Sequence, residues 1–212
     1  MYIKFFILIN FITFLFSNSQ FEFYADGELL EYKENGVTIN KLTDNVRVFN
    51  DSLYLKTDQA YNYKELNTLY LYGNTEMISK TDTLICDSMI YWLDKDSLFA
   101  FGNVKLSQIN QKLNTKNLYF WETNGYRGSS FIAEKGVTII RGGKEIHAAK
   151  IQYKDNEQYM DLSGNAMILS GNRELFGNNI NIQFNDSLIS SINVNGDAKA
   201  HNIIYAKVKE ND

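Results

Sequence analysis

Side chains that could carry out chemistry are few in this chain of 212 residues. Its two histidines, His147 and His201, lack a second ligand at the spacing typical of a metal site. The single cysteine, Cys86, occupies a position that other copies of a repeat fill with small residues, so we expect it to pack rather than react. The chain contains no Gly-x-Ser-x-Gly turn, no phosphate-binding loop and no Cys-His arrangement. We therefore predict that the protein is not an enzyme, binds no metal and needs no cofactor.

Two further groups of side chains have the chemistry of a binding site. Asp82, Asp87, Asp94 and Asp96 carry the oxygen ligands that calcium prefers. They lie in or beside predicted turns, where Asp is expected in any case, and we favour the turn interpretation. The Tyr and Phe side chains could form a stacking platform for sugars or bases, but alternate positions on strands are typical of packing on a sheet face.

Composition excludes some classes of protein. The chain has 21 Lys and Arg against 25 Asp and Glu, and no clustered basic surface of the kind that nucleic acid requires is visible. With one cysteine it forms no internal disulfide, so its stability must come from burial. Its length suffices for one domain with a sizeable core.

A tandem repeat organises the elements that must position any site. From Gly73 onward, the repeated glycines are 29, 34, 28 and 32 residues apart. A period in this range indicates one supersecondary unit stacked on copies of itself. The copies are Gly73-Asn74, Gly102-Asn103 and Gly164-Asn165, with weaker ones at Asp44-Asn45, Gly136 and Gly196-Asp197.

Apolar residues alternate on both sides of each repeated glycine, as at Leu71 and Thr75 around Gly73. Because the phase survives the glycine, we predict one long strand bent there; a two-residue hairpin at Gly-Asn is the alternative. The second strand of each unit, such as the segment from Leu84 to Tyr91, breaks its period of two midway, as a β-bulge does. With short turns at both ends, these units predict an all-β, up-and-down antiparallel meander folded over on itself.

The N-terminus has a different character. Lys4 precedes an apolar run from Phe5 to Phe16, and small residues follow before a predicted cleavage point after Ser19. This is typical of a secretory signal peptide over residues 1–19, since the run is shorter than the ~20 residues that span a membrane. Residues 20–212 would then form a single exported domain without significant helix. An uncleaved membrane anchor is the alternative.

Two adjacent segments resemble a known family. Residues 84–92, together with residues 96–106 around Gly102-Asn103-Val104, are similar to the OstA-like domain of lipopolysaccharide transport proteins, the LptA-like family. The similarity extends roughly from Ala25 to Ala200, although Thr75 and alanines replace the usual Val and Gly136 lacks its Asn. The resemblance implies a repeat-built β-jellyroll that is open along one side, like a folded taco.

The resemblance also implies a function. Family members shield the acyl chains of lipopolysaccharide in the periplasm of a double-membrane bacterium and stack end to end from inner to outer membrane. Partners would be lipopolysaccharide, other jellyroll proteins joined by edge-strand addition, and further copies head to tail. The candidate edges are residues 21–42 and 203–208. Inward-facing candidates for lipid contact are Leu71, Met77, Leu98, Leu106, Leu113, Phe120, Phe131, Ile139, Met160, Leu162 and Ile168.

Other functions remain open from the residues alone. A family member that keeps its N-terminal anchor would hand lipid on from the inner membrane. A periplasmic accessory protein with the same interior would carry another lipid. A structural or adhesive secreted β-solenoid would carry none, and in that case the inward-facing residues would be ordinary core.

Overall fold

The computed structural model describes residues 21–79, 81–122, 129–185 and 188–202. The predicted signal peptide or anchor and the predicted edge at residues 203–208 lie outside these ranges. Within them, no helix is long and apolar enough to cross a membrane. A single 3₁₀ turn, η1 (Lys64–Leu66), is the one helical element of the described part of the chain.

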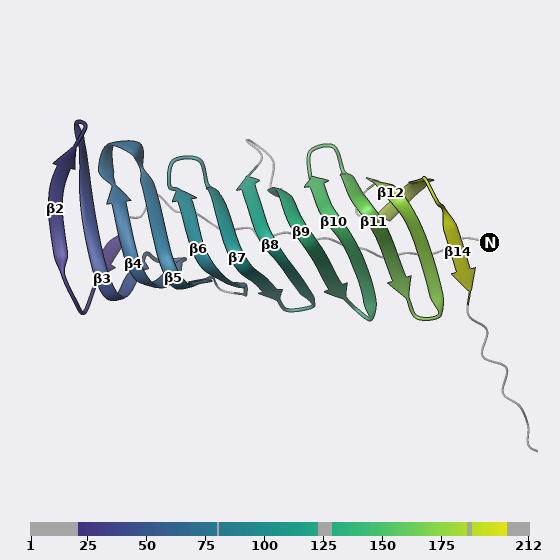
Figure 1. Cartoon of the computed structure of the whole chain (residues 1–212), viewed down its shortest axis with the longest axis horizontal. Helices are drawn as coiled ribbons and strands as arrows, with labels where there is room; N and C mark the ends of the chain where they lie inside the picture. The colour runs from purple at the N-terminus through teal and green to yellow at the C-terminus, as the bar shows by residue number, and fades with distance from the viewer. Residues whose placement is uncertain (1–20, 80, 123–128, 186–187, 203–212) are drawn as a thin grey trace, which may run out of the picture.

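Fourteen described strands form one sheet, in which nearly every strand pairs with its neighbours in the sequence. All the pairs are antiparallel, as predicted for a meander (Figure 1). The strands are β1 (Glu22–Tyr24), β2 (Leu29–Glu34), β3 (Val37–Phe49), β4 (Tyr54–Tyr63), β5 (Thr68–Ile78), β6 (Thr83–Trp92), β7 (Ser97–Gln108), β8 (Gln111–Glu122), β9 (Ser129–Arg141), β10 (Lys144–Lys154), β11 (Tyr159–Ser170), β12 (Arg173–Asn185), β13 (Leu188–Asn195) and β14 (Lys199–Asn202).

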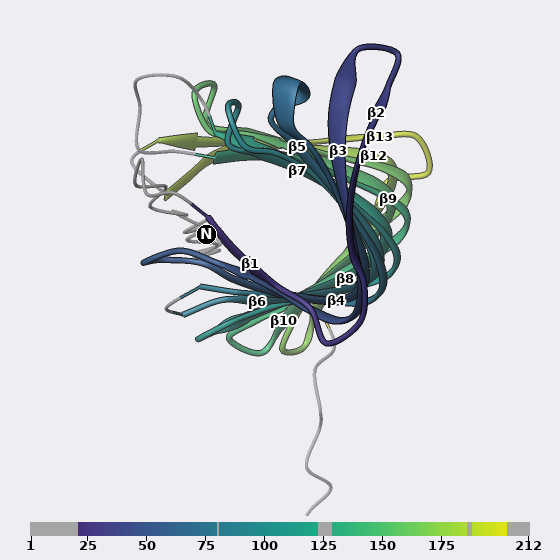
Figure 2. The same cartoon turned by 90° about the vertical axis from the view of Figure 1, so that its left-hand side faces the viewer.

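The sheet folds over along its length into two arms joined by a curved wall (Figure 2). The lower arm in Figure 2 holds the strand halves that meet at turns such as Gly142-Gly143, and the upper arm holds the other halves. β1 pairs with one half of β3 and β2 with the other half, and no pairing among the described strands joins the tips of the two arms across the open side. The predicted all-β meander, open along one side, is confirmed.

β5, β7 and β11 each bend at their repeated Gly-Asn pair, and β9 bends at Lys135-Gly136. Gly73 and Asn74 have φ of 77° and 43°, and β5 continues through them. The pairing between β5 and β6 skips from Tyr72 to Thr75 at this point, which is the register shift of a bulge. Left-handed backbone favours Gly and Asn, which explains the recurring pair. The predicted bent strand is confirmed at Gly73, Gly102, Gly136 and Gly164, and the hairpin alternative is wrong.

Hydroxyl groups satisfy backbone carbonyls that the bends release from the ladder. Thr57 Oγ1 lies 2.9 Å from the Tyr72 carbonyl oxygen, and Thr115 Oγ1 donates to the carbonyl of Glu134 at 2.7 Å. Both threonines are buried. A buried carbonyl without a partner is destabilising, so these hydroxyls permit a sharp bend inside the core.

The last copy of the repeat differs from the prediction. At Gly196-Asp197 the strand stops, and β13 and β14 pair separately with the two halves of β12. Ala198 and Ala200, which continue the alternating pattern beyond Gly196, are exposed, although Ala200 pairs with Leu175 of the inward face. Since no described strand pairs with the far side of β14, ladder hydrogen bonds on one side alone hold it to the sheet.

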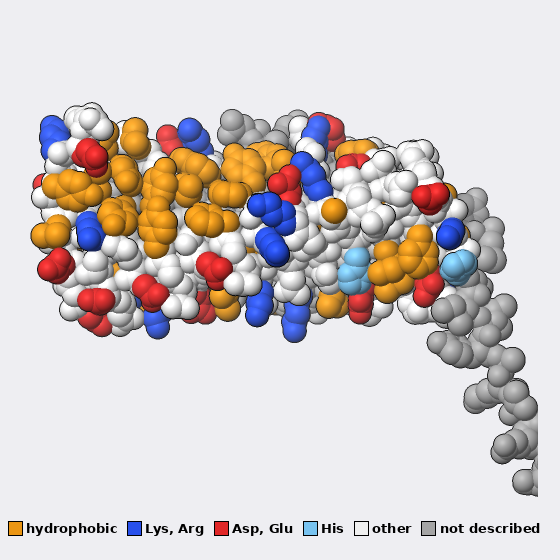
Figure 3. Space-filling view, in the orientation of Figure 1, with side chains coloured by type: hydrophobic (Ala, Val, Ile, Leu, Met, Phe, Trp, Pro, Cys, Tyr) orange, Lys and Arg blue, Asp and Glu red, His pale blue; other side chains and the backbone are white. Residues whose placement is uncertain are grey.

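The outward-facing side chains differ in polarity between the two halves of the molecule. One cross-strand row on the outer face of the upper arm is apolar over β4–β9 and turns polar over β10–β13. Figure 3 shows hydrophobic side chains gathered over the first half of this face and few over the second. The apolar members, called here the outer apolar band, are Tyr61, Tyr70, Ile90, Phe99, Tyr119 and Ile132; the polar continuation is Gln152, Asp161, Asn181 and Asn193.

Candidate functional site: the apolar interior

The eleven predicted inward residues all lie between the two arms, and each is at most 4% exposed. Alternation along the strands brings them there, because every second side chain of a strand points to the same face. Leu71, Leu98, Phe120, Phe131, Met160 and Leu162 belong to the upper arm, and Met77, Leu106, Leu113, Ile139 and Ile168 belong to the lower arm.

Cross-strand pairing joins these side chains into rows that run the length of the molecule. On the lower arm an unbroken apolar row crosses ten strands from Val48 to Leu175. On the upper arm a parallel row runs from Leu69 to Ile192. Together they form a continuous apolar lining, and the arms meet through side chains. The sequence predicted the facing of these residues; it did not reveal how completely they fill the space.

The upper row is rich in aromatic rings. Phe120 pairs across the sheet with Phe131, whose ring centroid lies 5.9 Å from that of Tyr153. Phe184 completes the series at 6.3 Å from Tyr153. The Tyr153 hydroxyl donates to Asp155 at 2.8 Å, and burial, followed by that hydrogen bond, raises the pKa of Tyr153. The hydroxyl therefore stays protonated, and the rings act as apolar lining.

The sequence candidates for reactive or metal chemistry are separated. Cys86 is buried at a bend, opposite Thr75, and burial raises its pKa to about 12, so a thiolate is not formed at neutral pH. His147 contacts Glu145 at 3.1 Å and Thr138 at 3.1 Å, whereas His201 lies 3.5 Å from Glu174.

The four aspartates also take separate places. Asp82 accepts from Gln108 before β6, Asp87 lies at the bend of β6, and Asp94 and Asp96 follow the end of that strand. Among the described residues, no group of three His, Cys, Asp or Glu is arranged to hold a metal. The aspartates thus serve turns and bends.

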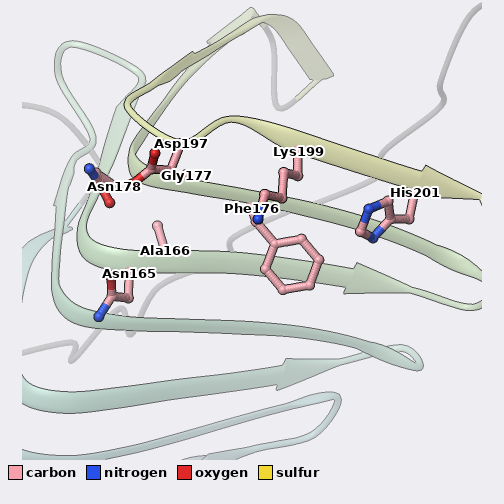
Figure 4. Close-up of a pocket in the computed structure, with 8 residues that line it drawn as sticks. All are labelled: Asn165, Ala166, Phe176, Gly177, Asn178, Asp197, Lys199 and His201. Atoms are coloured by element: carbon pink, nitrogen blue, oxygen red, sulfur yellow. The ribbon is translucent and has the colours of Figure 1, made fainter.

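A surface cavity of about 340 Å³ lies where the last copy of the repeat breaks (Figure 4). None of the eleven inward candidates lines it. Gly177 packs closely against Val194 beside the gap between β13 and β14, and the ring of Phe176 lies 5.9 Å from that of His201. Its lining residues are Asn165, Ala166, Phe176, Gly177, Asn178, Asp197, Lys199 and His201.

Polar residues that the sequence reading missed end the inward-facing rows of the lower arm. Gln111, Arg141, Lys144 and Arg173 follow one another across β8–β12, with Ser170 between the last two. Each continues the inward phase of an apolar strand at the position beside its turn. We call Gln111, Arg141, Lys144 and Arg173 the basic rim. The sequence did carry a signal, because each charged or amide residue of the rim continues the alternating inward positions of its strand. It lay beside a turn, where polar residues are expected in any case.

A family model matches part of the chain. Residues 86–187 match the family described as LptA/(LptD N-terminal domain) LPS transport protein, a family of transport proteins. This match confirms the resemblance found in the sequence. The crystal structure of LptH, the LptA homologous periplasmic component of the lipopolysaccharide transport device from Pseudomonas aeruginosa, aligns at 12% identity with a TM-score of 0.30. The alignment covers 73% of this chain and 95% of that one. No curated protein matches the chain.

Proposed function

We propose, from the premise that residues 86–187 form a domain of the LptA-like lipopolysaccharide transport family, that this protein carries lipopolysaccharide by shielding its acyl chains between the two arms. The observation that carries the proposal is the continuous apolar lining. A lipid carrier needs an apolar path without interruption, and cross-strand rows provide one along the whole sheet.

The energetics favour acyl chains as the main source of affinity. Burial of hydrocarbon contributes ~0.8 kcal/mol per CH₂, so a twelve-carbon chain contributes about 10 kcal/mol. The protein carries a formal net charge of −4, so its overall field repels an anionic lipid. Apolar burial must therefore outweigh long-range repulsion, and salt weakens that repulsion further.

Access to the interior requires the tips of the arms to separate. Side chains of both arms bury one another, as in the complete burial of Leu71, Met77 and Leu162. Past β3, the pairings all lie between strands adjacent in the sheet, so the bends are the natural hinge. A lipid that enters replaces contacts between apolar side chains with contacts to its own chains, which limits the free-energy penalty of opening.

Location and assembly follow from the same proposal. The protein would act in the periplasm, with residues 1–19 as signal peptide and residues 20–212 as the carrier domain. β2, which is exposed throughout, offers one free edge, and β13 and β14 offer the other. Strand addition at these edges would join the interior to those of other jellyroll proteins or further copies.

Photo-crosslinking tests the proposal. A photo-reactive amino acid at Leu106 or Leu162, in the full chain incubated with lipopolysaccharide, is expected to form a lipid adduct detected by mass spectrometry. The matched control is Lys105, the outward-facing neighbour of Leu106. Adducts at the inward positions alone would support a lipid-conducting interior. Their absence from a protein whose circular dichroism is β-rich would overturn the proposal in favour of a structural β-solenoid.

A further inference from the structure

The two arginines of the basic rim, Arg141 and Arg173, differ in their surroundings from Arg47, the other arginine in the described part of the chain, which pairs with Asp26. Neither Arg141 nor Arg173 forms an ion pair with a described carboxylate, whereas Arg47, Lys64, Lys150 and Lys154 each do. Arg141 is partly buried, and its Nη1 donates only a long 3.5 Å hydrogen bond to Gln111 Oε1. Burial lowers the pKa of Arg141, as expected where no anion offsets the loss of water.

Gln111 supplies an independent sign that an acceptor is missing. Its side chain is 94% buried, and while Oε1 faces Arg141, the Nε2 donor has no hydrogen-bond partner among the described residues. A buried donor without a partner is destabilising. Together with the guanidinium of Arg141, this amide presents N–H groups that a multi-oxygen anion satisfies.

The position of the rim relates it to the apolar lining. Gln111 lies two residues from Leu113, Arg141 two from Ile139, and Lys144 two from Ile146, all on the inward face. The opposite arm ends in acidic groups instead: Asp155 accepts from Tyr153, and burial and the neighbouring Asp94 raise the pKa of Asp96. Over β8–β12 an anion at the mouth would therefore meet cations on the lower arm and carboxylates on the upper, while the one buried carboxylate described at the lower-arm end, Asp82, lies before β6 and accepts from Gln108.

We propose that the basic rim binds the phosphate-bearing headgroup of the lipid whose acyl chains enter the interior, which fixes the lipid with its head at the tip of the lower arm over β8–β12. The inference rests on the proposed function. Phosphate suits the rim because its oxygens accept several hydrogen bonds at once and Arg pairs with it in a two-pronged fashion.

Paired lipids test the inference. Binding of the full-length protein to diphosphorylated lipid A and to the same lipid after enzymatic dephosphorylation is measured by native mass spectrometry over a concentration series. The wild type is expected to bind the phosphorylated form about tenfold more tightly, the effect of one charge-assisted contact. Arg141→Gln/Arg173→Gln is expected to abolish this preference while still binding the dephosphorylated lipid.

Two variants guard the interpretation. Lys105→Gln/Lys112→Gln removes the same charge from the outward face of β7 and β8 and is expected to retain the tenfold preference. Gln111→Glu preserves the volume of the side chain and places a carboxylate beside Arg141. It is expected to reduce the preference for the phosphorylated lipid, because this carboxylate pairs with Arg141 in place of phosphate. Circular dichroism and thermal melting verify that each variant folds.

The outcomes separate the two proposals. Equal preference in wild type and Arg141→Gln/Arg173→Gln would overturn the headgroup site and leave lipid carriage standing. Failure of the wild type to bind either lipid would overturn both. If inorganic phosphate at millimolar concentration binds the rim but lipid A does not, the rim is a site for free anions and the headgroup assignment is wrong.

Discussion

Pairs of side chains on successive strands stabilise the bends. Asn74 Nδ2 donates to Asp58 at 2.8 Å, and Asn103 Nδ2 donates to Asp87 at 3.0 Å. In each case the glycine before the asparagine lies directly over the same carboxylate. The Gly-Asn pair thus has two reasons to recur: a left-handed backbone, and a close approach that leaves no room for a side chain.

Substitution of Gly102 separates these two reasons. A Cβ at Gly102 would come within 2.8 Å of the Asp87 Cβ, while one at Gly136, which also has a positive φ of 85°, would meet nothing within 4 Å. We expect Gly136→Ala to destabilise by about 1 kcal/mol through backbone strain alone, and Gly102→Ala by about 2 kcal/mol or more. Urea unfolding measures both, and equal losses would contradict the steric contribution.

Asp96 provides a pH-dependent test. It lies in left-handed backbone at φ 42°, and burial together with Asp94 raises its pKa above the ordinary value of 3.8. Its ionised form is therefore disfavoured in the fold, so stability is lower above the folded pKa and is regained as pH falls through it. Asp96→Asn is expected to raise the melting temperature at pH 7. The gain in free energy of unfolding should be less than about 1 kcal/mol, because the side chain is partly exposed. The gain should disappear near pH 3, where both side chains are neutral.

Neighbouring residues on one strand alternate between the interior and the outer face of the sheet. On β8, Phe120 is 1% exposed and lines the interior, while Tyr119 is 37% exposed and belongs to the outer apolar band. The outer band is held by ring contacts such as Tyr119 with Trp121, at 5.0 Å, rather than by enclosure.

Alanine at these two neighbours measures the difference. Phe120→Ala is expected to lose about 3–5 kcal/mol because it removes a buried ring and leaves a cavity. Tyr119→Ala is expected to lose about 1 kcal/mol, the value of an aromatic contact on an open sheet face. Chemical denaturation compares them, and similar losses would mean that the outer band is as enclosed as the core.

Prediction from the sequence succeeded where one local signal fixed the outcome. The unbroken phase around Gly73 specified a bent strand, because a period of two leaves no other way to keep Leu71 and Thr75 on one face. The break at Gly196 shows the same motif without a strand beyond it to hold the ladder. The basic rim was missed because its members are neighbours across the sheet and lie up to 62 residues apart in sequence, from Gln111 to Arg173.

Across the whole molecule, contacts are almost entirely between elements adjacent in the sequence. Such a chain behaves as a one-dimensional stack, in which a strand's stability depends on its immediate neighbours. Among the described strands, β6 to β11 have full-length partners on both sides, whereas β1, β2, β13 and β14 pair on one side only.

Hydrogen exchange follows from this arrangement. Backbone amides of β6–β11 are expected to exchange slowest, with protection that falls step by step toward β2 and toward β14. Mass spectrometry of peptic fragments after exchange measures the profile. Uniform protection along the chain would instead indicate a single cooperative unit.

Because the strands pair in sequence order, the number of repeats sets the length of the molecule. Each hairpin of the repeat adds two strand spacings, about 10 Å, to the long axis without altering the bends or the lining on either side. The twelve strands on the main path therefore set a reach of roughly 50 Å. Duplication or deletion of one unit would lengthen or shorten that reach in fixed steps, so the span of such a protein can be tuned by copy number alone.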